Sequence, residues 1–317
     1  MPSHVKPHNA KRILCVGMAV RDLVFGVRDL PMRGGKAHAD HFDEIAGGNA
    51  LNAAIGITRL GGEARFSGPM GDATEKQCEF IFDQLEAEGI DHSGVVRMPG
   101  LVTPISNIMI DPSGERTIVT FRHPDLWKVK LPDADQLLAG CSAVLVENRC
   151  ASFVTELCSE ARRRGLAVIV DADQVMSLRE GLLTASSHIV FSAETLFATA
   201  GTQDAAQALR RIAALTPSFV AVTLGAHGMT WLDGAGRISQ MPTFPVHTVD
   251  TLGAGDVFHG GFALAVAEGA GVEDAMRFAS AAAALKCTRF GGAFAAPTRA
   301  EVEKLLSEAP RAASGRA

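Results

Sequence analysis

Residues 249–261 decide the fold of this chain, and they read Val249-Asp250-Thr251-Leu252-Gly253-Ala254-Gly255-Asp256-Val257-Phe258-His259-Gly260-Gly261. Gly253, Ala254 and Gly255 are three small residues in a row, so the backbone can turn tightly and bring its N–H groups close to a ligand. A helix-like run follows at once, and a helix N-terminus adds unpaired N–H groups and the positive end of the helix dipole. The stretch therefore predicts an anion site at the start of a long helix.

Asp256 lies inside this predicted anion site. A carboxylate needs no anion hole for itself, so we interpret the N–H groups as holding a phosphoryl group while Asp256 accepts the proton of an attacking hydroxyl. This is the arrangement of a kinase. The alternative is that Asp256 caps the helix and the glycines only turn the chain, as these residues commonly do. Taken alone, the stretch does not separate the two interpretations.

Composition limits the classes of protein that the chain can belong to. Its 317 residues suit one large α/β domain with an accessory element, or two modest domains. No apolar span approaches the ~20 residues that a transmembrane helix needs, and the polar start is no signal peptide, so we expect a cytoplasmic protein. A net charge of -5 argues against nucleic acid or an anionic membrane as the main partner.

The first third of the chain predicts a ligand-binding carboxylate at the end of a buried strand and a flap made of two strand pairs. Asp22 follows the apolar run 12–18, and a carboxylate beyond the end of a buried strand can accept hydrogen bonds from sugar hydroxyls. A solvated turn is the alternative. Two turn-linked strand pairs, 23–27 with 36–45 and 104–110 with 116–122, predict a small sheet over one edge of the main domain.

A second glycine-rich motif opens a helix that runs to Leu60. Gly47 and Gly48 precede Asn49, and Asn52 follows three residues later. On a helix this spacing puts both amides on one face, where each can donate to and accept from hydroxyls. An ordinary asparagine cap would explain Asn49 but neither the two glycines nor the second amide.

From residue 143 onward the pattern alternates between strand and helix. Buried strands are predicted at 143–146, 167–171, 188–191 and 219–224, with helices between them, and such alternation favours a doubly wound, mostly parallel α/β sheet. Thr223, Gly225 and Gly228 close the last strand with glycines that let the backbone approach a flat or phosphorylated ligand. This loop is a weak motif by itself.

Two motifs together match a known family. Gly47-Gly48-Asn49-Ala50-Leu51-Asn52-Ala53-Ala54, followed by Arg59-Leu60-Gly61, and Asp250-Thr251-Leu252-Gly253-Ala254-Gly255-Asp256 resemble the two signatures of the ribokinase or PfkB family of carbohydrate kinases. The resemblance implies a ribokinase-like domain at 11–308 with a β-sheet lid from 23–45 and 101–123, and we expect 309–317 to be a frayed tail. It also implies ATP- and Mg²⁺-dependent transfer of a phosphoryl group to a sugar hydroxyl, allows a monovalent cation, and suggests a homodimer through the lid.

The resemblance assigns roles to individual residues. Asp256 resembles the catalytic base, and the backbone of Gly253, Ala254 and Gly255 the anion hole. The positions that resemble the sugar-binding set are Asp22, Gly47, Gly48, Asn49 and Asn52, and those on the nucleotide side are Ser192, Thr223, Gly225 and Gly228. One departure concerns the metal: the family's Asn-x-x-Glu segment reads Ser192-Ala193-Glu194-Thr195 here, so the carboxylate of Glu194 is displaced by one place.

Within the family, the chain most resembles the bacterial sulfofructose kinase and ketose kinase branch. Lys36 and Arg149 match cationic positions that bind the sulfonate in that branch, and Thr120 stands where it has an asparagine. Two cations suit an anionic sugar tail, since charge-assisted hydrogen bonds are the stronger kind. The alternatives are a neutral ketohexose such as fructose, with both cations solvated at the surface.

Two further classes remain as alternatives. A dinucleotide-dependent oxidoreductase would place Gly-x-Gly-x-x-Gly after the first strand, but Gly17 is followed by Met18 and Ala19. A sensor of the same fold that binds sugar or nucleotide without turnover is the other alternative, and retention of Asp256 argues against it.

Overall fold

The computed structural model describes residues 10–309 except 73 and 115, together with residues 315–316. Within this part of the chain the main sheet has ten strands in the order β14-β13-β12-β11-β10-β9-β8-β1-β4-β5. Its strands are β1 Arg12–Val16, β4 Glu63–Met70, β5 Asp91–Arg97, β8 Ala143–Glu147, β9 Ala167–Ala172, β10 His188–Ser192, β11 Phe219–Thr223, β12 Met229–Leu232, β13 Ile238–Met241 and β14 Gly315–Arg316. Neighbours from β5 to β11 are parallel, and β11 to β14 are antiparallel. The predicted doubly wound, mostly parallel sheet is confirmed.

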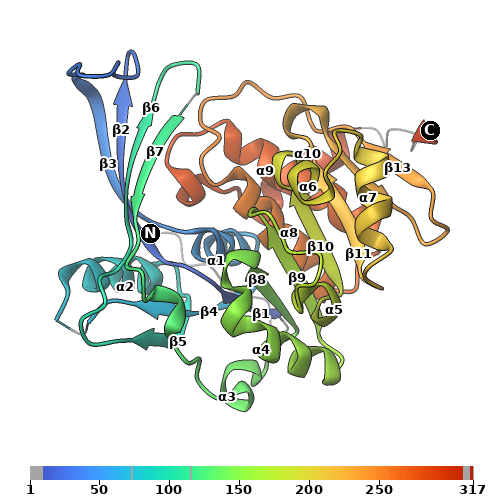
Figure 1. Ribbon diagram of the computed structural model, residues 1–317. Coiled ribbons are helices and arrows are strands. Elements are labelled where there is room, and N and C mark those ends of the chain that lie inside the picture. The colour runs from blue at the N-terminus through green and yellow to red at the C-terminus, as the bar shows by residue number, and fades with distance from the viewer. Residues whose placement is uncertain (1–9, 73, 115, 310–314, 317) are drawn as a thin grey trace.

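Helices cover both faces of this sheet (Figure 1). They are α1 Asn49–Arg59, α2 Lys76–Ala87, α3 Ala134–Leu138, α4 Ala151–Arg163, α5 Leu182–Ala185, α6 Ala193–Ala200, α7 Ala205–Ala213, α8 Ala254–Ala267, α9 Val272–Cys287 and α10 Arg299–Glu308. Successive strand residues point to opposite faces, so Ile13 and Cys15 of β1 join the core under α1, α8 and α9, whereas Leu14 and Val16 join the core under α4, α6 and α7. Strands buried on both faces explain the continuous apolar runs in the sequence. None of the helices in the described residues is long and apolar enough to cross a membrane.

The order of the strands reverses between β1 and β8. Strand β1 pairs with β4 on one side and with β8 on the other, while the chain visits β4 and β5 before it returns to β8. Open α/β sheets bind their ligands beyond the carboxyl ends of the strands at such a reversal. The fold therefore directs attention to the segments that follow β1, β8 and β9.

The lid is a separate four-stranded sheet in the order β3-β2-β6-β7, which projects from one side of the main domain (Figure 1). Its strands are β2 Val20–Val27, β3 Ala39–Gly47, β6 Ile105–Ile110 and β7 Arg116–Phe121. Strand β2 pairs antiparallel with β3 and parallel with β6, and β7 closes the sheet beside β6. Both predicted strand pairs thus lie in one sheet.

The predicted strand start at Lys36 is wrong, because β3 begins at Ala39. Lys36 lies in an exposed loop that follows a turn in which the N–H of Gly35 bonds to the carbonyl of Met32, with Gly34 at a φ of 78°. At the other end of the chain, β14 pairs with β13, so residues 315–316 differ from the expected frayed tail. Residues 310–314 and 317 of that tail lie outside the described residues.

Candidate active site

The glycine turn caps α8 as the sequence predicts. Gly253 is the N-cap residue and has a φ of 75°, a left-handed conformation that glycine adopts without strain. A Cβ at this position would also lie 3.1 Å from the backbone nitrogen of Ala293. Ala254 and Gly255 begin the helix, and Asp256 lies in its first turn. The N–H of Ala254 donates to the carbonyl oxygen of Thr251 over 3.2 Å, and the N–H groups of this first turn lie beside the carboxylate of Asp256.

Close packing of α1 against α8 brings the two sequence motifs together. A Cβ at Gly260 would lie 2.6 Å from the carbonyl oxygen of Ala53, so only glycine lets the helices approach this far. At this contact Nδ2 of Asn52 donates to Oδ2 of Asp256 over 2.7 Å. The side chain predicted to bind sugar and the predicted base are thus hydrogen-bonded neighbours.

The pKa of Asp256 is raised from 3.8 to about 7. Burial is the main cause, and the nearby carboxylate of Asp171 adds to it, while the hydrogen bond from Asn52 and the imidazole of His259 act in the opposite direction. A base works best when its pKa is near the working pH. The environment of Asp256 therefore suits a general base.

His259 lies one helical turn after Asp256 and is buried. Its Nδ1 lies 2.8 Å from the carbonyl oxygen of Gly255, so this nitrogen must donate, and its Nε2 lies 3.5 Å from Oδ1 of Asp171. Burial lowers the pKa of His259. The imidazole therefore connects the anion turn to the end of β9, a contact that the sequence motif did not indicate.

Asn49 reaches two carboxylates that the sequence analysis did not assign. Its Nδ2 donates to Oδ2 of Asp171 over 3.1 Å and to Oδ2 of Asp173 over 3.0 Å. Burial, reinforced by Asp173, raises the pKa of Asp171. Asp171 and Asp173 could have been predicted as site residues, because they lie at the carboxyl end of β9, beside the strand reversal.

Asp22 lies on β2 and is buried where the lid meets the core. A Cβ at Gly47 would lie 1.9 Å from its Oδ2, and Gly48 has a φ of 102°, so both glycines are needed for the chain to pass this carboxylate. Burial raises the pKa of Asp22 to about 7, against a hydrogen bond from Ser106 that lowers it. The Ser106 hydroxyl in turn lies 2.9 Å from that of Thr120, so Thr120 joins this polar chain.

Arg149 is not the free cation that the sequence suggested. It forms an ion pair with Asp173, and its Nε lies 3.4 Å from Oε2 of Glu147. Glu147 ends β8, and register pairs it with Asp171 of β9. Its Oε1 accepts from the backbone N–H groups of Met18 and Ala50, both over 2.9 Å, and burial raises its pKa to about 8.

The Glu147–Arg149–Asp173 cluster leaves polar atoms unpaired. In the described part of the chain, Glu147 Oε2, Arg149 Nε and Asp173 Oδ1 are buried without a hydrogen-bond partner. Nε of Arg149 and Oε2 of Glu147 lie at ion-pair distance, 3.4 Å, without a hydrogen bond, and Oδ1 of Asp173 has no hydrogen-bond partner among the described residues. Buried polar groups are normally hydrogen-bonded, so the cluster has capacity that a ligand or water can fill. Lys36, the other predicted cation, is exposed in the lid loop and forms no ion pair among the described residues.

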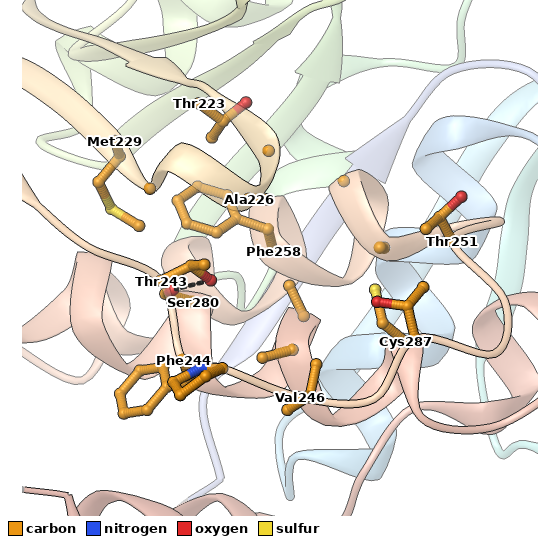
Figure 2. Close-up of a pocket in the computed structure, with 18 residues that line it drawn as sticks. Thr223, Ala226, Met229, Thr243, Phe244, Val246, Thr251, Phe258, Ser280 and Cys287 are labelled. Carbon is orange, nitrogen blue, oxygen red and sulfur yellow. Dashed lines mark hydrogen bonds between the residues drawn. The ribbon is translucent and has the colours of Figure 1, made fainter. Parts of the chain in front are cut away.

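A cavity of about 580 Å³ opens beside the anion turn (Figure 2). Its walls come from the loop after β11, the segment 243–248, the start of α8 and one face of α9. The predicted residues Thr223, Gly225 and Gly228 all line it, as do Ala254 and Gly255 of the anion turn. None of the described residues that line it is charged, and its polar side chains include the hydroxyls of Thr243 and Ser280, which lie 3.4 Å apart.

Ser192 and Glu194 lie at the junction of β10 and α6. The Ser192 hydroxyl accepts from the N–H of Thr195 and caps α6, and register places Ser192 beside Thr223. Glu194 is exposed in the first turn of this helix. Among the described residues no group of three or more His, Cys, Asp or Glu side chains forms a metal site. Mg²⁺ usually keeps several waters and takes one or two carboxylates plus phosphate oxygens, and Glu194 offers one exposed carboxylate at this junction.

Known proteins resemble this chain along nearly its whole length. The model of the pfkB family carbohydrate kinases matches residues 10–299. Ribokinase of Bacillus subtilis (strain 168) is 27% identical over 303 residues, covering 94% of this chain and 100% of the relative, and fructokinase-1 of Oryza sativa subsp. japonica is 27% identical over 307 residues, covering 86% and 92%. A putative ribokinase from Agrobacterium tumefaciens has a TM-score of 0.90 at 39% identity, covering 95% of this chain and 98% of that one. Arabidopsis thaliana ribokinase complexed with ribose and ATP has a TM-score of 0.82 at 25% identity, covering 94% and 99%.

Proposed function

This chain belongs to the pfkB family of carbohydrate kinases, and we propose that it transfers the γ-phosphoryl group of ATP to a hydroxyl of a ketose-type sugar. One observation carries this proposal. Asp256 lies in the first turn of α8, where Gly255 lines the uncharged cavity, and it is hydrogen-bonded to Asn52 of the glycine-rich motif. A nucleotide on one side and a sugar on the other would meet at this carboxylate.

The carboxylate of Asp256 and the N–H groups of the turn have different roles in the proposed reaction. Asp256 accepts the proton of the sugar hydroxyl as that oxygen attacks the γ-phosphorus. The N–H groups of Gly253 and Gly255, together with that of Ala254, which also donates to the carbonyl of Thr251 over 3.2 Å, stabilise the charge on the transferring phosphoryl oxygens. Mg²⁺, held by Glu194 and by phosphate oxygens, would neutralise phosphate charge when bound.

The cavity lined by Thr223, Gly225 and Gly228 is the proposed nucleotide site. Its size is within the range of small-molecule sites, and its apolar walls suit a flat base. The ATP bound by the Arabidopsis thaliana ribokinase supports this assignment. Phosphates would extend from the cavity toward Gly255, where the helix dipole favours negative charge.

Sugar hydroxyls are proposed to bind along α1 and the end of the lid. Asp22, Asn49 and Asn52 present carboxylate and amide groups there, and each can exchange hydrogen bonds with a hydroxyl. The unpaired atoms of Glu147, Arg149 and Asp173 add two acceptors and one donor. A polyhydroxylated acceptor satisfies such a set better than an apolar one.

Two kinds of sugar are candidates for the acceptor, and they differ at the end that is remote from the reacting hydroxyl: one is neutral there and the other carries a sulfonate. The pairing of Arg149 with Asp173 favours a neutral ketohexose such as fructose, because the guanidinium charge is already balanced. A second guanidinium, that of Arg122, favours 6-deoxy-6-sulfofructose. Burial and then the charge of Arg149 lower the pKa of Arg122, whereas Glu147 and Asp173 act in the opposite direction, and a bound anion would add to their effect. Lys36 lies in the exposed loop before β3, so it would contact the sulfonate only if this loop folds inward on binding.

A turnover assay over a panel of acceptors tests the proposal. ADP release would be measured with ATP and Mg²⁺ against fructose, 6-deoxy-6-sulfofructose, ribose, glucose and a nucleoside. We expect the highest kcat/KM for a ketose. Preference for an aldose or a nucleoside would contradict the ketose assignment, and binding without ADP release would support the sensor alternative.

The lid is proposed to exclude water from the reaction and to form a homodimer. Leu252 of the anion turn packs against Val24, Ile108 and Ile110 of the lid, so the two regions are in contact. Strand β7 is an edge strand with exposed Val119 and Phe121, and unpaired edges of this kind favour strand addition. Hydrogen exchange tests lid closure, and lid amides should gain protection when sugar and nucleotide are bound. Light scattering tests the dimer, and Val119→Asp should shift the measured mass toward that of the monomer.

A further inference from the structure

A lysine is completely buried behind the anion turn. Lys286 of α9 has a relative exposure of 0%, and its Nζ lies 2.8 Å from both the carbonyl oxygen and Oδ2 of Asp250, which is 1% exposed. Burying an ammonium group is costly unless it is paired. A well-packed apolar side chain would hold this place at lower cost, so the charge itself calls for an explanation.

The ion pair joins three separate segments. Besides Lys286, the Asp250 carboxylate accepts from the N–H of Leu252 over 2.7 Å and from those of Gly291 and Gly292 over 3.3 and 3.2 Å. It therefore ties the anion turn to α9 and to the loop before residues 292–295. Gly253, the N-cap of α8, packs against that same loop at Ala293.

The surroundings of Nζ match those of a monovalent cation. A backbone carbonyl and a carboxylate oxygen converge on one positive centre, and K⁺ or NH₄⁺ prefers oxygen ligands of this kind. The family resemblance allows a monovalent cation, but here these two oxygens already bind the ammonium of Lys286. The residues present at this point therefore do not fit a separate ion.

We propose that Lys286 is a built-in cation that positions the anion turn, and that the enzyme consequently needs no monovalent cation. The role is a positioning one, since Lys286 contacts Asp250 and not the reacting atoms. Fixing Asp250 fixes the start of the turn whose N–H groups hold the phosphoryl group. The proposal rests on phosphoryl transfer at this turn and not on which sugar is the acceptor.

Two substitutions of Lys286 distinguish the effect of its charge from the effect of its volume. Lys286→Ala removes the ammonium and leaves room for an ion or a small amine, whereas Lys286→Met fills much of the same space without charge. Lys304→Ala, which removes an exposed ammonium on α10, controls for general salt effects. Thermal unfolding and ATP turnover would be measured for each protein in KCl, NH₄Cl, methylammonium chloride, NaCl and choline chloride at equal ionic strength.

Wild-type Tm and kcat should be the same in KCl, NaCl and choline chloride. Lys286→Ala should lose at least about tenfold in kcat, and NH₄⁺, K⁺ or methylammonium should restore much of that loss. These cations should also raise its Tm by about 3 °C or more over choline. Neither Lys286→Met nor Lys304→Ala should show this response.

Activation of the wild type by K⁺ would overturn the proposal, as would a Lys286→Ala variant whose Tm is indifferent to these cations. The Tm readout requires no acceptor sugar, so it remains valid if the sugar proposed above is wrong. If Lys286→Ala does not fold, the ion response of the wild type still decides the question.

Discussion

Two buried groups of charges in this protein differ in how completely their polar atoms are paired. Around the Asp250–Lys286 pair, the carboxylate accepts from the ammonium and from three backbone N–H groups. In the Glu147–Arg149–Asp173 cluster, each residue has one buried atom without a partner among the described residues. Both groups lie beside the predicted site, but only the second has unused hydrogen-bonding capacity.

The difference distinguishes a group of charges that stabilises the fold from one that can bind a ligand. A saturated ion pair has nothing left to offer a ligand, so its effect is to hold backbone in place. An unsaturated cluster stays unfavourable until a ligand or water completes it, and a substrate with hydroxyls or an anionic group can do so. The four predictions below test this contrast, from the largest expected effect to the smallest.

Asp256→Asn should lower turnover by ~10²–10⁴-fold, the usual worth of a positioned general base. Because the Asp250–Lys286 pair and not Asp256 holds the turn, the variant should keep its Tm and its affinity for ATP. Steady-state ADP release, thermal unfolding and nucleotide titration would be measured together. A folded variant with near-normal turnover would show that another group takes the proton.

Asp250→Asn and Asp173→Asn compare the two groups directly. Removing one member of the saturated pair leaves Lys286 buried without its counter-charge and should reduce the free energy of unfolding by about 3–5 kcal/mol. Asp173 is 23% exposed and raises the pKa of both Asp171 and Glu147, so its substitution breaks the pair with Arg149 but also relieves like-charge repulsion and should cost only about 1 kcal/mol. Urea unfolding of both variants measures this. Equal losses would remove the distinction between the two groups.

The pH dependence of kcat/KM should follow the raised pKa of Asp256. The base works only when ionised, so kcat/KM should rise as the pH increases toward about 7 and fall roughly tenfold per pH unit below it. An ordinary carboxyl group would place this inflection near pH 4 instead. The residual activity of Asp256→Asn serves as the control, and any inflection that remains near pH 7 in this variant belongs to another group such as Asp22, whose pKa is also raised to about 7.

Arg149→Ala should change which sugar is preferred. If the cluster binds an anionic tail, kcat/KM for 6-deoxy-6-sulfofructose should fall ~10-fold or more, the scale of a charge-assisted hydrogen bond of about 1.5–3 kcal/mol, while fructose is spared. Arg163→Ala removes an exposed guanidinium from α4 and is the matched control. Equal losses for both sugars would mean that Arg149 serves the fold through Asp173.

The sequence was sufficient for the elements with strong periodicity. Apolar runs such as 143–146 and 188–191 gave the parallel strands, and the two glycine motifs gave the starts of α1 and α8. Strand β5 was missed because its residues, Asp91–Arg97, are mostly polar at the sheet edge. The short hairpin of β12 and β13 was missed as well, since four-residue strands carry little pattern.

The site was harder to predict where it depends on strand register. Glu147 and Asp171 are far apart in sequence, and only the pairing of β8 with β9 places them side by side. Asp173 then reaches Arg149, so a cation that looked free in the sequence is paired in the fold. Asp256 could be identified because the glycine turn and the helix start around it are continuous in sequence, whereas its contacts with Asn52 and Asp171 depend on the fold.

A single residue, Gly48, separates the lid strand β3, which ends at Gly47, from helix α1, which starts at Asn49. Its φ of 102° and the 2.1 Å that would separate its Cβ from the carbonyl oxygen of Met18 exclude any other side chain. Because Gly48 alone connects the two elements, any rotation of β3 either changes the backbone torsions of Gly48 or moves Asn49. Gly48 is therefore the hinge of this connection, and a movement of β3 on sugar binding would displace the proposed sugar ligands Asn49 and Asn52 directly.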